Sequence, residues 1–148
     1  MAEALAGQAC RQGYEATYVS ASKMLGTLFS ARADASYAKK LRALARVDLL
    51  VIDDFGLKPL RTPEDEDFYE VVNERYEKRS ILLTSNLDPK DEWDKVFPNP
   101  LLGAAIVDRL RHRAHPVIIY GSSIRCLRSG VQNGKKGGEL KNPEHVSR

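Results

Sequence analysis

Two adjacent carboxylates, Asp53 and Asp54, directly follow a run of large apolar residues at 49–52. An unalternated apolar run is typical of a parallel strand buried on both faces. Open parallel sheets bind their ligands just beyond the carboxyl ends of the strands, which is where these acids are expected. Because two neighbouring carboxylates repel each other, the pair favours a bound cation such as Mg²⁺ or a basic ligand. The alternative is that Asp54 caps a following turn and Asp53 is solvated.

A second apolar run, at residues 81–83, also ends in polar side chains, those of Thr84, Ser85 and Asn86. The pattern predicts another buried parallel strand over residues 80–86. A polar amide or hydroxyl at the end of such a strand suits the positioning of a ligand or a water molecule, although turn formation is the alternative role for Thr84 and Ser85.

A basic sector lies further along the chain. Residues 109–128 hold five arginines and no acid, although the formal charge of the whole chain is only +3. Such a sector favours an anionic partner, either phosphate or nucleic acid. Arg111, Arg113 and Arg125 either contact nucleic acid or face only solvent, and the sequence does not decide between the two.

Helices and strands alternate in the elements that must position these residues. Gly13 is a C-terminal stop for the first helix, and Ser20 or Ser22 caps the second. Thr62 before Pro63 predicts another helix start, with four acids in its first turn. We expect helices over residues 2–12, 22–31, 37–46, 63–79 and 100–112, a short helix within 87–99, and strands over 15–19, 49–54, 80–86 and 117–120. This order predicts an α/β fold with a parallel sheet and helices on both faces.

Apolar residues that recur at helical spacing are expected to face the core. They are Met24, Leu25, Leu28 and Phe29 in one helix, Leu41 and Leu44 in the next, Phe68, Val71, Val72 and Tyr76 in a third, and Leu101, Leu102, Ala105, Ile106 and Leu110 in the last.

Composition places the chain among ordinary globular domains. It has 148 residues, of which 43% are hydrophobic and 29% charged, enough for one domain with a core. Cys10, Cys126 and the three histidines lack metal-ligand spacing, so we expect free thiols in a reducing cytoplasm rather than a zinc site. No apolar run approaches membrane-spanning length. The glycine- and lysine-rich residues 129–148 are expected to be a disordered basic tail after a folded core of residues 1–128.

The motifs together resemble a known family. Residues 41–127 are similar to the IstB family of transposition-helper ATPases and to the related helicase loaders of the DnaC type, both of the AAA+ class. The likeness rests on residues 47–60, 80–88 and 106–125, and it continues weakly through residues 2–45. It implies a P-loop NTPase fold of the AAA+ type, a three-layer sandwich with a parallel sheet.

The resemblance also implies roles for single residues. Asp53 matches the Walker B ligand of Mg²⁺, Asp54 matches the residue that polarises the attacking water, and Asn86 matches sensor 1. Arg109 matches the arginine finger that reaches a neighbouring subunit, the alternative being a salt bridge with Asp108 or another acid. The cofactors would be ATP and Mg²⁺. The partners would be DNA, a transposase and further copies of the chain.

One departure from the family pattern stands out. The 148 residues contain no glycine-rich loop ending in Lys-Ser or Lys-Thr, which the family places directly before the helix at 2–12. We therefore expect a partial core, truncated after the phosphate loop and inactive by itself. The missing strand would leave residues 81–85 and 117–120 with unpaired inner edges. The isolated chain would then be unstable, or these two edges would pair directly.

Three other functions are weighed against the transposition helper. A DnaC-like helicase loader is the nearest, because the motifs are shared. A non-catalytic remnant that binds DNA or a protein partner is the second. A phosphoacceptor receiver domain would use Asp53 and Thr84, but the acid pair expected after its first strand and the lysine expected after a late strand are both missing.

Overall fold

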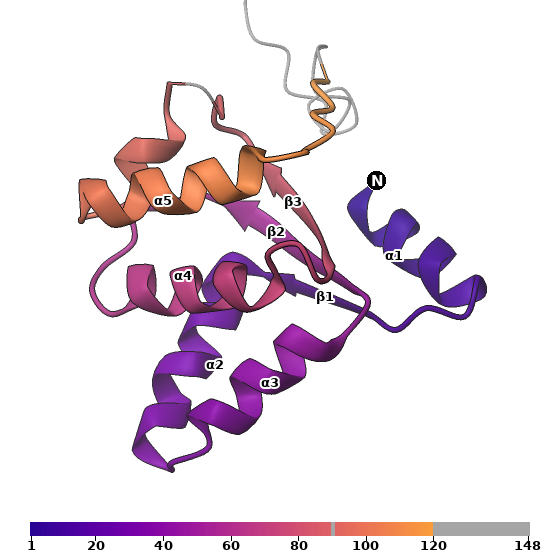
Figure 1. Cartoon of the computed structure of the whole chain (residues 1–148), viewed down its shortest axis with the longest axis horizontal. Helices are drawn as coiled ribbons and strands as arrows, with labels where there is room; N and C mark the ends of the chain where they lie inside the picture. The colour runs from indigo at the N-terminus through magenta and orange to yellow at the C-terminus, as the bar shows by residue number, and fades with distance from the viewer. Residues whose placement is uncertain (90, 120–148) are drawn as a thin grey trace, which may run out of the picture. The chain divides into compact units, whose positions relative to one another are not determined.

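The computed structural model describes residues 1–89 and 91–119, which belong to two units, Met1–Ala114 and His115–Arg148. The first unit contains all the regular elements of the described residues (Figure 1). In chain order they are α1 (Ala2–Arg11), β1 (Ala16–Ser20), α2 (Ala21–Ala33), α3 (Tyr37–Arg46), β2 (Leu49–Phe55), α4 (Glu64–Arg75), β3 (Ser80–Ser85), the 3-10 helix η1 (Trp93–Val96) and α5 (Pro100–Arg111).

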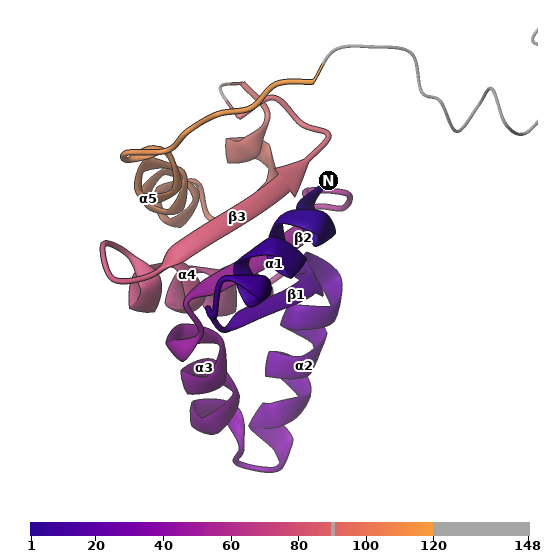
Figure 2. The same cartoon turned by 90° about the vertical axis from the view of Figure 1, so that its right-hand side faces the viewer.

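The three strands form one parallel sheet in the order β1-β2-β3. Helix α1 lies on one face of the sheet, and α2 and α4 lie on the other (Figures 1 and 2). This arrangement confirms the predicted α/β fold with helices on both faces. None of the helices among residues 1–89 and 91–119 is long and apolar enough to cross a membrane.

The central strand β2 is buried on both faces, which explains why its apolar run does not alternate. Leu50 and Ile52 point into the larger core, with side chains of α2, α4 and α5. Val51 points to the opposite face, where it packs under Ala2 and Ala6 of α1. The largest side chains of the main core are the fully or nearly fully buried Met24, Leu25, Leu28, Phe55, Phe68 and Ile106.

Several sequence predictions fail at the edges of elements. Phe29 and Leu101 are 58% and 82% exposed, because the predicted apolar stripe of each helix is wider than the face that the core covers. Thr62 does not cap α4. The turn before the helix is closed instead by Glu64, whose backbone N–H donates to the Arg61 carbonyl and whose carboxylate accepts from the Arg61 N–H. The four acids do occupy the first turn of α4.

The strand predicted over residues 117–120 is also wrong for its described residues. Its described residues, 117–119, have no regular structure and are exposed. The predicted pairing of this segment with β3 stays a prediction, because residues 117–119 and β3 belong to different units. Residue 120, the predicted tail at 129–148 and Arg125 lie outside the described residues.

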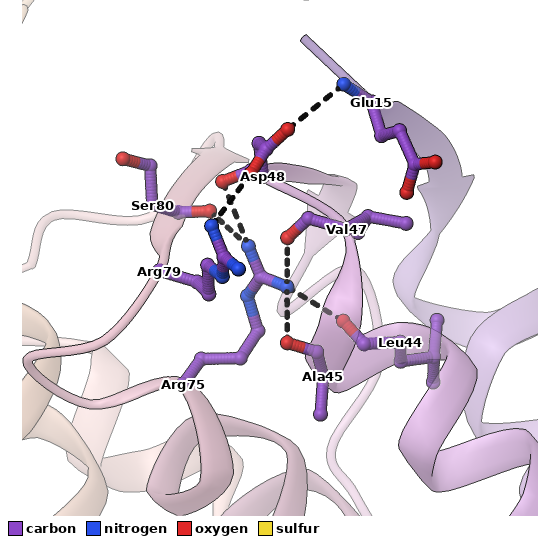
Figure 3. A network of polar contacts seen from close by, with 8 residues as sticks. All are labelled: Glu15, Leu44, Ala45, Val47, Asp48, Arg75, Arg79 and Ser80. Carbon is purple, nitrogen blue, oxygen red and sulfur yellow. Dashed lines mark hydrogen bonds and ion pairs between the residues drawn. The ribbon is translucent and has the colours of Figure 1, made fainter.

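A single buried arginine joins α3, α4 and the beginnings of two strands (Figure 3). The side chain of Arg75, at the end of α4, is completely buried. Its guanidinium donates to five backbone carbonyls: those of Leu44 at 2.6 Å, Ala45 at 3.3 Å, Val47 at 2.9 Å, Asp48 at 3.3 Å and Ser80 at 2.6 Å. Burial and the nearby charge of Arg79 lower the pKa of Arg75 to about 10, so the group stays charged at neutral pH.

We predict that Arg75→Met destabilises the fold by at least about 3 kcal/mol, because it leaves several buried carbonyls without donors. Urea unfolding followed by circular dichroism measures the change. Arg42→Met, at an exposed position of α3, is the matched control and is expected to change the free energy of unfolding by less than about 0.5 kcal/mol. Equal effects of the two substitutions would show that the carbonyl contacts of Arg75 do not stabilise the fold.

Candidate active site

Asp53, near the carboxyl end of β2, is held from both neighbouring strands. The hydroxyl of Thr84 in β3 donates to Oδ1, and the phenol of Tyr18 in β1 donates to Oδ2. These two hydrogen bonds, first from Thr84 and then from Tyr18, hold the pKa of Asp53 below its usual range. Asp53 is therefore an ionised carboxylate in a fixed orientation, with no arginine or lysine bonded to it in the described part of the chain.

Asp54 adopts a different backbone conformation. Its φ is 57°, in the left-handed region, and the register between β2 and β3 shifts between Ile52 and Phe55. The Asp54 N–H donates to Thr84 Oγ1 at 3.0 Å, so one threonine fixes both acids. The Asp54 side chain is exposed, and no described residue donates a hydrogen bond to it. The irregularity turns the two adjacent acids in different directions and leaves Asp54 free to meet a ligand or water.

The end of β3 is tied to the end of β2 by Ser85. Its hydroxyl donates to the Phe55 carbonyl at 2.8 Å and accepts from the Leu87 N–H at 3.1 Å. Gly56 is necessary at the adjoining turn, because its φ is +80° and an added Cβ would lie 2.5 Å from Leu87 Cδ1. Asn86 follows Ser85 directly and is exposed, at the carboxyl end of β3 beside that of β2, where Asp54 lies. Thr84 and Ser85 thus position the site as well as forming a turn.

The predicted arginines are placed differently. Arg109, on α5, donates to the Ala105 carbonyl at 3.0 Å and to the Tyr69 hydroxyl at 3.4 Å. Its guanidinium lies over the rings of Tyr69 and Tyr76, 5.2 and 5.7 Å from their centroids. It makes no ion pair with Asp108 and no hydrogen bond to Asp53 within residues 1–89 and 91–119, because it is turned back onto α4.

The remaining basic residues are solvent-facing where they are described. Arg111, in the last turn of α5, and Arg113, just after it, are both exposed. Neither side chain makes a hydrogen bond or ion pair within the described ranges. The structure therefore places Asp53, Asp54, Thr84 and Asn86 at the carboxyl ends of β2 and β3, whereas Arg109, Arg111 and Arg113 lie on or just after α5.

One residue of the site was missed from the sequence. Tyr18 lies two positions before Ser20, which pairs with Asp53 across β1 and β2. Side chains two apart share a face of a sheet, so a long side chain at position 18 can reach Asp53 diagonally. This pairing becomes available only when the register of the two strands is known.

The donor set fits a magnesium ion that is completed by phosphate oxygens. The described residues contain no group of three or more carboxylate, histidine or cysteine side chains that could hold a metal alone. Mg²⁺ is typically bound by one or two carboxylates together with water and substrate phosphates, and Asp53 is an ionised carboxylate of this kind. The beginning of α1 lies at the same end of the sheet as the carboxyl ends of β2 and β3 (Figures 1 and 2). The N-terminal end of a helix attracts anions.

Comparison with known proteins identifies the family. Residues 1–131 match the family model of the IstB-like ATP binding proteins. The chain belongs to this family. An insertion-sequence ATP-binding protein of Sinorhizobium fredii is 38% identical over 125 residues, which cover 84% of this chain and 51% of that protein. The IS21 ATP-binding protein of Pseudomonas aeruginosa is 32% identical over 148 residues, covering 99% of this chain and 54% of that protein.

Both relatives are insertion-sequence ATP-binding proteins. The IstB-like chain spans about half the length of the curated relatives it matches. Among solved structures, the replication initiator DnaA bound to AMPPCP and single-stranded DNA is similar with a TM-score of 0.60 at 19% identity, over 70% of this chain and 32% of that one. This likeness supports the P-loop ATPase fold.

The contact between Tyr18 and Asp53 generates a pH-dependent prediction. The hydrogen bond to Asp53 raises the pKa of Tyr18 to about 12 from 10.0. The pKa of Tyr18 is higher in the folded chain than in the unfolded chain. The stabilisation from this hydrogen bond is therefore fully present below pH 10, and it is lost as the pH rises through about 12.

We expect Asp53→Asn to lower the pKa of Tyr18 toward 10, measured by a residue-specific ¹³Cζ NMR titration. Tyr37 is an internal control, since burial and then Asp67 raise its pKa to about 12 independently of Asp53. An unchanged Tyr18 pKa in Asp53→Asn would contradict the contact.

Proposed function

We propose that the chain forms the metal- and water-binding half of an ATPase site in a protein that assists DNA transposition. The observation that carries the proposal is the ionised Asp53 carboxylate, oriented by hydroxyls from both flanking strands, with Asp54 exposed beside it. Membership of an ATP-binding family supports ATP as the nucleotide. The 148 residues contain no phosphate loop, so the β-phosphate would be bound by groups outside them.

Each site residue has a distinct role in this proposal. Asp53 holds Mg²⁺, which when bound neutralises charge on the phosphate oxygens. Asp54, with its exposed carboxylate, orients the attacking water and accepts its proton. The Asn86 amide, at the same edge, donates to and accepts from that water or the γ-phosphate. Thr84 keeps the two acids in their separate orientations.

The proposed partners follow from the surface of α5 and from the relatives. Arg109 would complete the site of a neighbouring copy, for which its guanidinium must leave Tyr69 and Tyr76. The exposed Arg111 and Arg113 would contact DNA phosphates, with Arg125 as a third contact proposed from sequence alone. A transposase is the proposed protein partner, because the relatives are insertion-sequence proteins, and the proposed location is the cytoplasm.

The test is ATP hydrolysis by the complete reading frame that contains these residues. We expect Asp54→Asn to reduce kcat by at least about 100-fold while Mg²⁺-dependent ATP binding is retained, because only water activation is removed. Glu74→Gln, at an exposed position of α4, is the matched control and should leave kcat within about twofold. Hydrolysis by Asp54→Asn at the unmodified rate would contradict the proposal.

A second prediction separates the roles of the arginines. Arg109→Ala is expected to reduce kcat by roughly 10³-fold, the usual contribution of an arginine finger, whereas Arg111→Ala should leave it nearly unchanged. Mixing Arg109→Ala with Asp54→Asn should restore part of the activity, because each variant supplies what the other lacks at a shared site. Absence of any recovery on mixing, in an assembly shown to contain both variants, would exclude a role of Arg109 between subunits.

A further inference from the structure

We propose that Tyr18 is a positioning residue for the metal-binding carboxylate of Asp53. The inference rests on the proposed function, since it concerns the same site, but it assigns a role to a residue outside the predicted motifs. Tyr18 does not touch the nucleotide in this proposal. It acts through Asp53, by fixing the direction in which the carboxylate oxygens point.

The strand register places the phenol where it can do this. Tyr18 pairs with Val51, and Ser20 pairs with Asp53, so Tyr18 and Asp53 lie on the same face of the sheet. This is the face on which Val51 packs under α1. The ring bridges one diagonal step between neighbouring strands, and its hydroxyl donates to Asp53 Oδ2.

The two hydroxyl donors together prevent the Asp53 carboxylate from rotating about its Cβ–Cγ bond, and its orientation matters for metal binding. A carboxylate bonded at one oxygen only can still rotate about its Cβ–Cγ bond. With Thr84 on Oδ1 and Tyr18 on Oδ2, the carboxylate plane is fixed from both sides. Each carboxylate oxygen has two acceptor directions, so these bonds leave one direction on each oxygen for a cation or its water. The arrangement orients Asp53 without blocking it.

Of the two donors, Tyr18 has the more specialised role. Thr84 also accepts from the Asp54 N–H, so it supports the backbone of the strand end as well. Tyr18 is 44% exposed, lies at the sheet edge, and its hydroxyl has no other hydrogen-bond partner within the described residues. Removing this one oxygen therefore tests the orientation of Asp53 with little effect on packing.

The experiment measures the affinity of Mn²⁺, used alone as a paramagnetic probe, for the 148-residue chain. Broadening of amide NMR signals around Asp53 reports binding. Loss of a group that orients a metal ligand typically reduces metal affinity about 10-fold or more, and we expect this from Tyr18→Phe. Tyr14→Phe is the matched control, because Tyr14 is 56% exposed and comes before the beginning of β1, whereas the site lies at the carboxyl ends of the strands. Asp53→Asn should abolish the broadening.

Two unnatural side chains at position 18 separate the effect of the hydrogen bond to Asp53 from the effect of ring packing. Replacing Tyr18 by 4-aminophenylalanine keeps a donor at the end of the ring and should restore most of the lost affinity, whereas O-methyltyrosine should not. In hydrolysis by the complete reading frame, Tyr18→Phe should raise the Mg²⁺ concentration needed for half-maximal rate by a similar factor and change kcat little.

The outcomes distinguish the two levels of the proposal. If Mn²⁺ binding depends on Asp53 but Tyr18→Phe binds as tightly as Tyr14→Phe, the role of Tyr18 is overturned and the proposed function stands. If Mn²⁺ broadens no signals near Asp53 in the unmodified chain, the metal role of Asp53 fails and the inference fails with it. A loss in Tyr18→Phe that the amino variant does not restore would assign the effect to packing rather than donation.

Discussion

The buried guanidinium of Arg75 fixes the relation between the helices and the sheet. A charged group that is fully buried must be compensated, and here carbonyls at the end of α3 and at the beginnings of β2 and β3 do so. Because Arg75 donates to both the Asp48 and the Ser80 carbonyls, it aligns β2 and β3 with each other where the two strands begin. The register Leu49↔Ser80 then carries along the strands to the other end of the sheet.

The site depends on that register. A shift of one residue between neighbouring strands moves every side chain of one strand to the opposite face. Such a shift in β3 would take the Thr84 hydroxyl away from Asp53, and in β1 it would remove Tyr18. Asp48 strengthens the same end of the sheet, since its carboxylate accepts from Arg79 at 2.6 Å and from the Glu15 N–H at 3.0 Å (Figure 3). The end of the sheet away from the chemistry therefore determines the geometry of the site.

The parts of the structure that follow local rules were predictable from the sequence. The apolar run of β2 and the stop at Gly13 each depend on neighbouring residues alone, and both predictions are confirmed. Arg75 lies inside the helix predicted over residues 63–79, and Tyr18 lies inside the strand predicted over 15–19, and neither prediction gives the residue a role. Their roles come from residues about 30 positions away, through contacts that no local pattern contains. The strand at 117–119 was predicted from β propensity alone, and these residues have no regular structure.

The way in which Asp53 is stabilised determines what the site can bind. An arginine bonded to this carboxylate would have oriented it and also neutralised it. Hydroxyl donors orient it and keep it ionised, but they leave its negative charge uncompensated. With the exposed Asp54 adjacent, the end of β2 carries two negative charges for which no described residue is a bonded counterion. A divalent cation removes this repulsion, and a phosphate chain near the beginning of α1 would in turn balance the cation. This is the physical reason for proposing a metal–phosphate ligand rather than a free anion, which the two acids would repel.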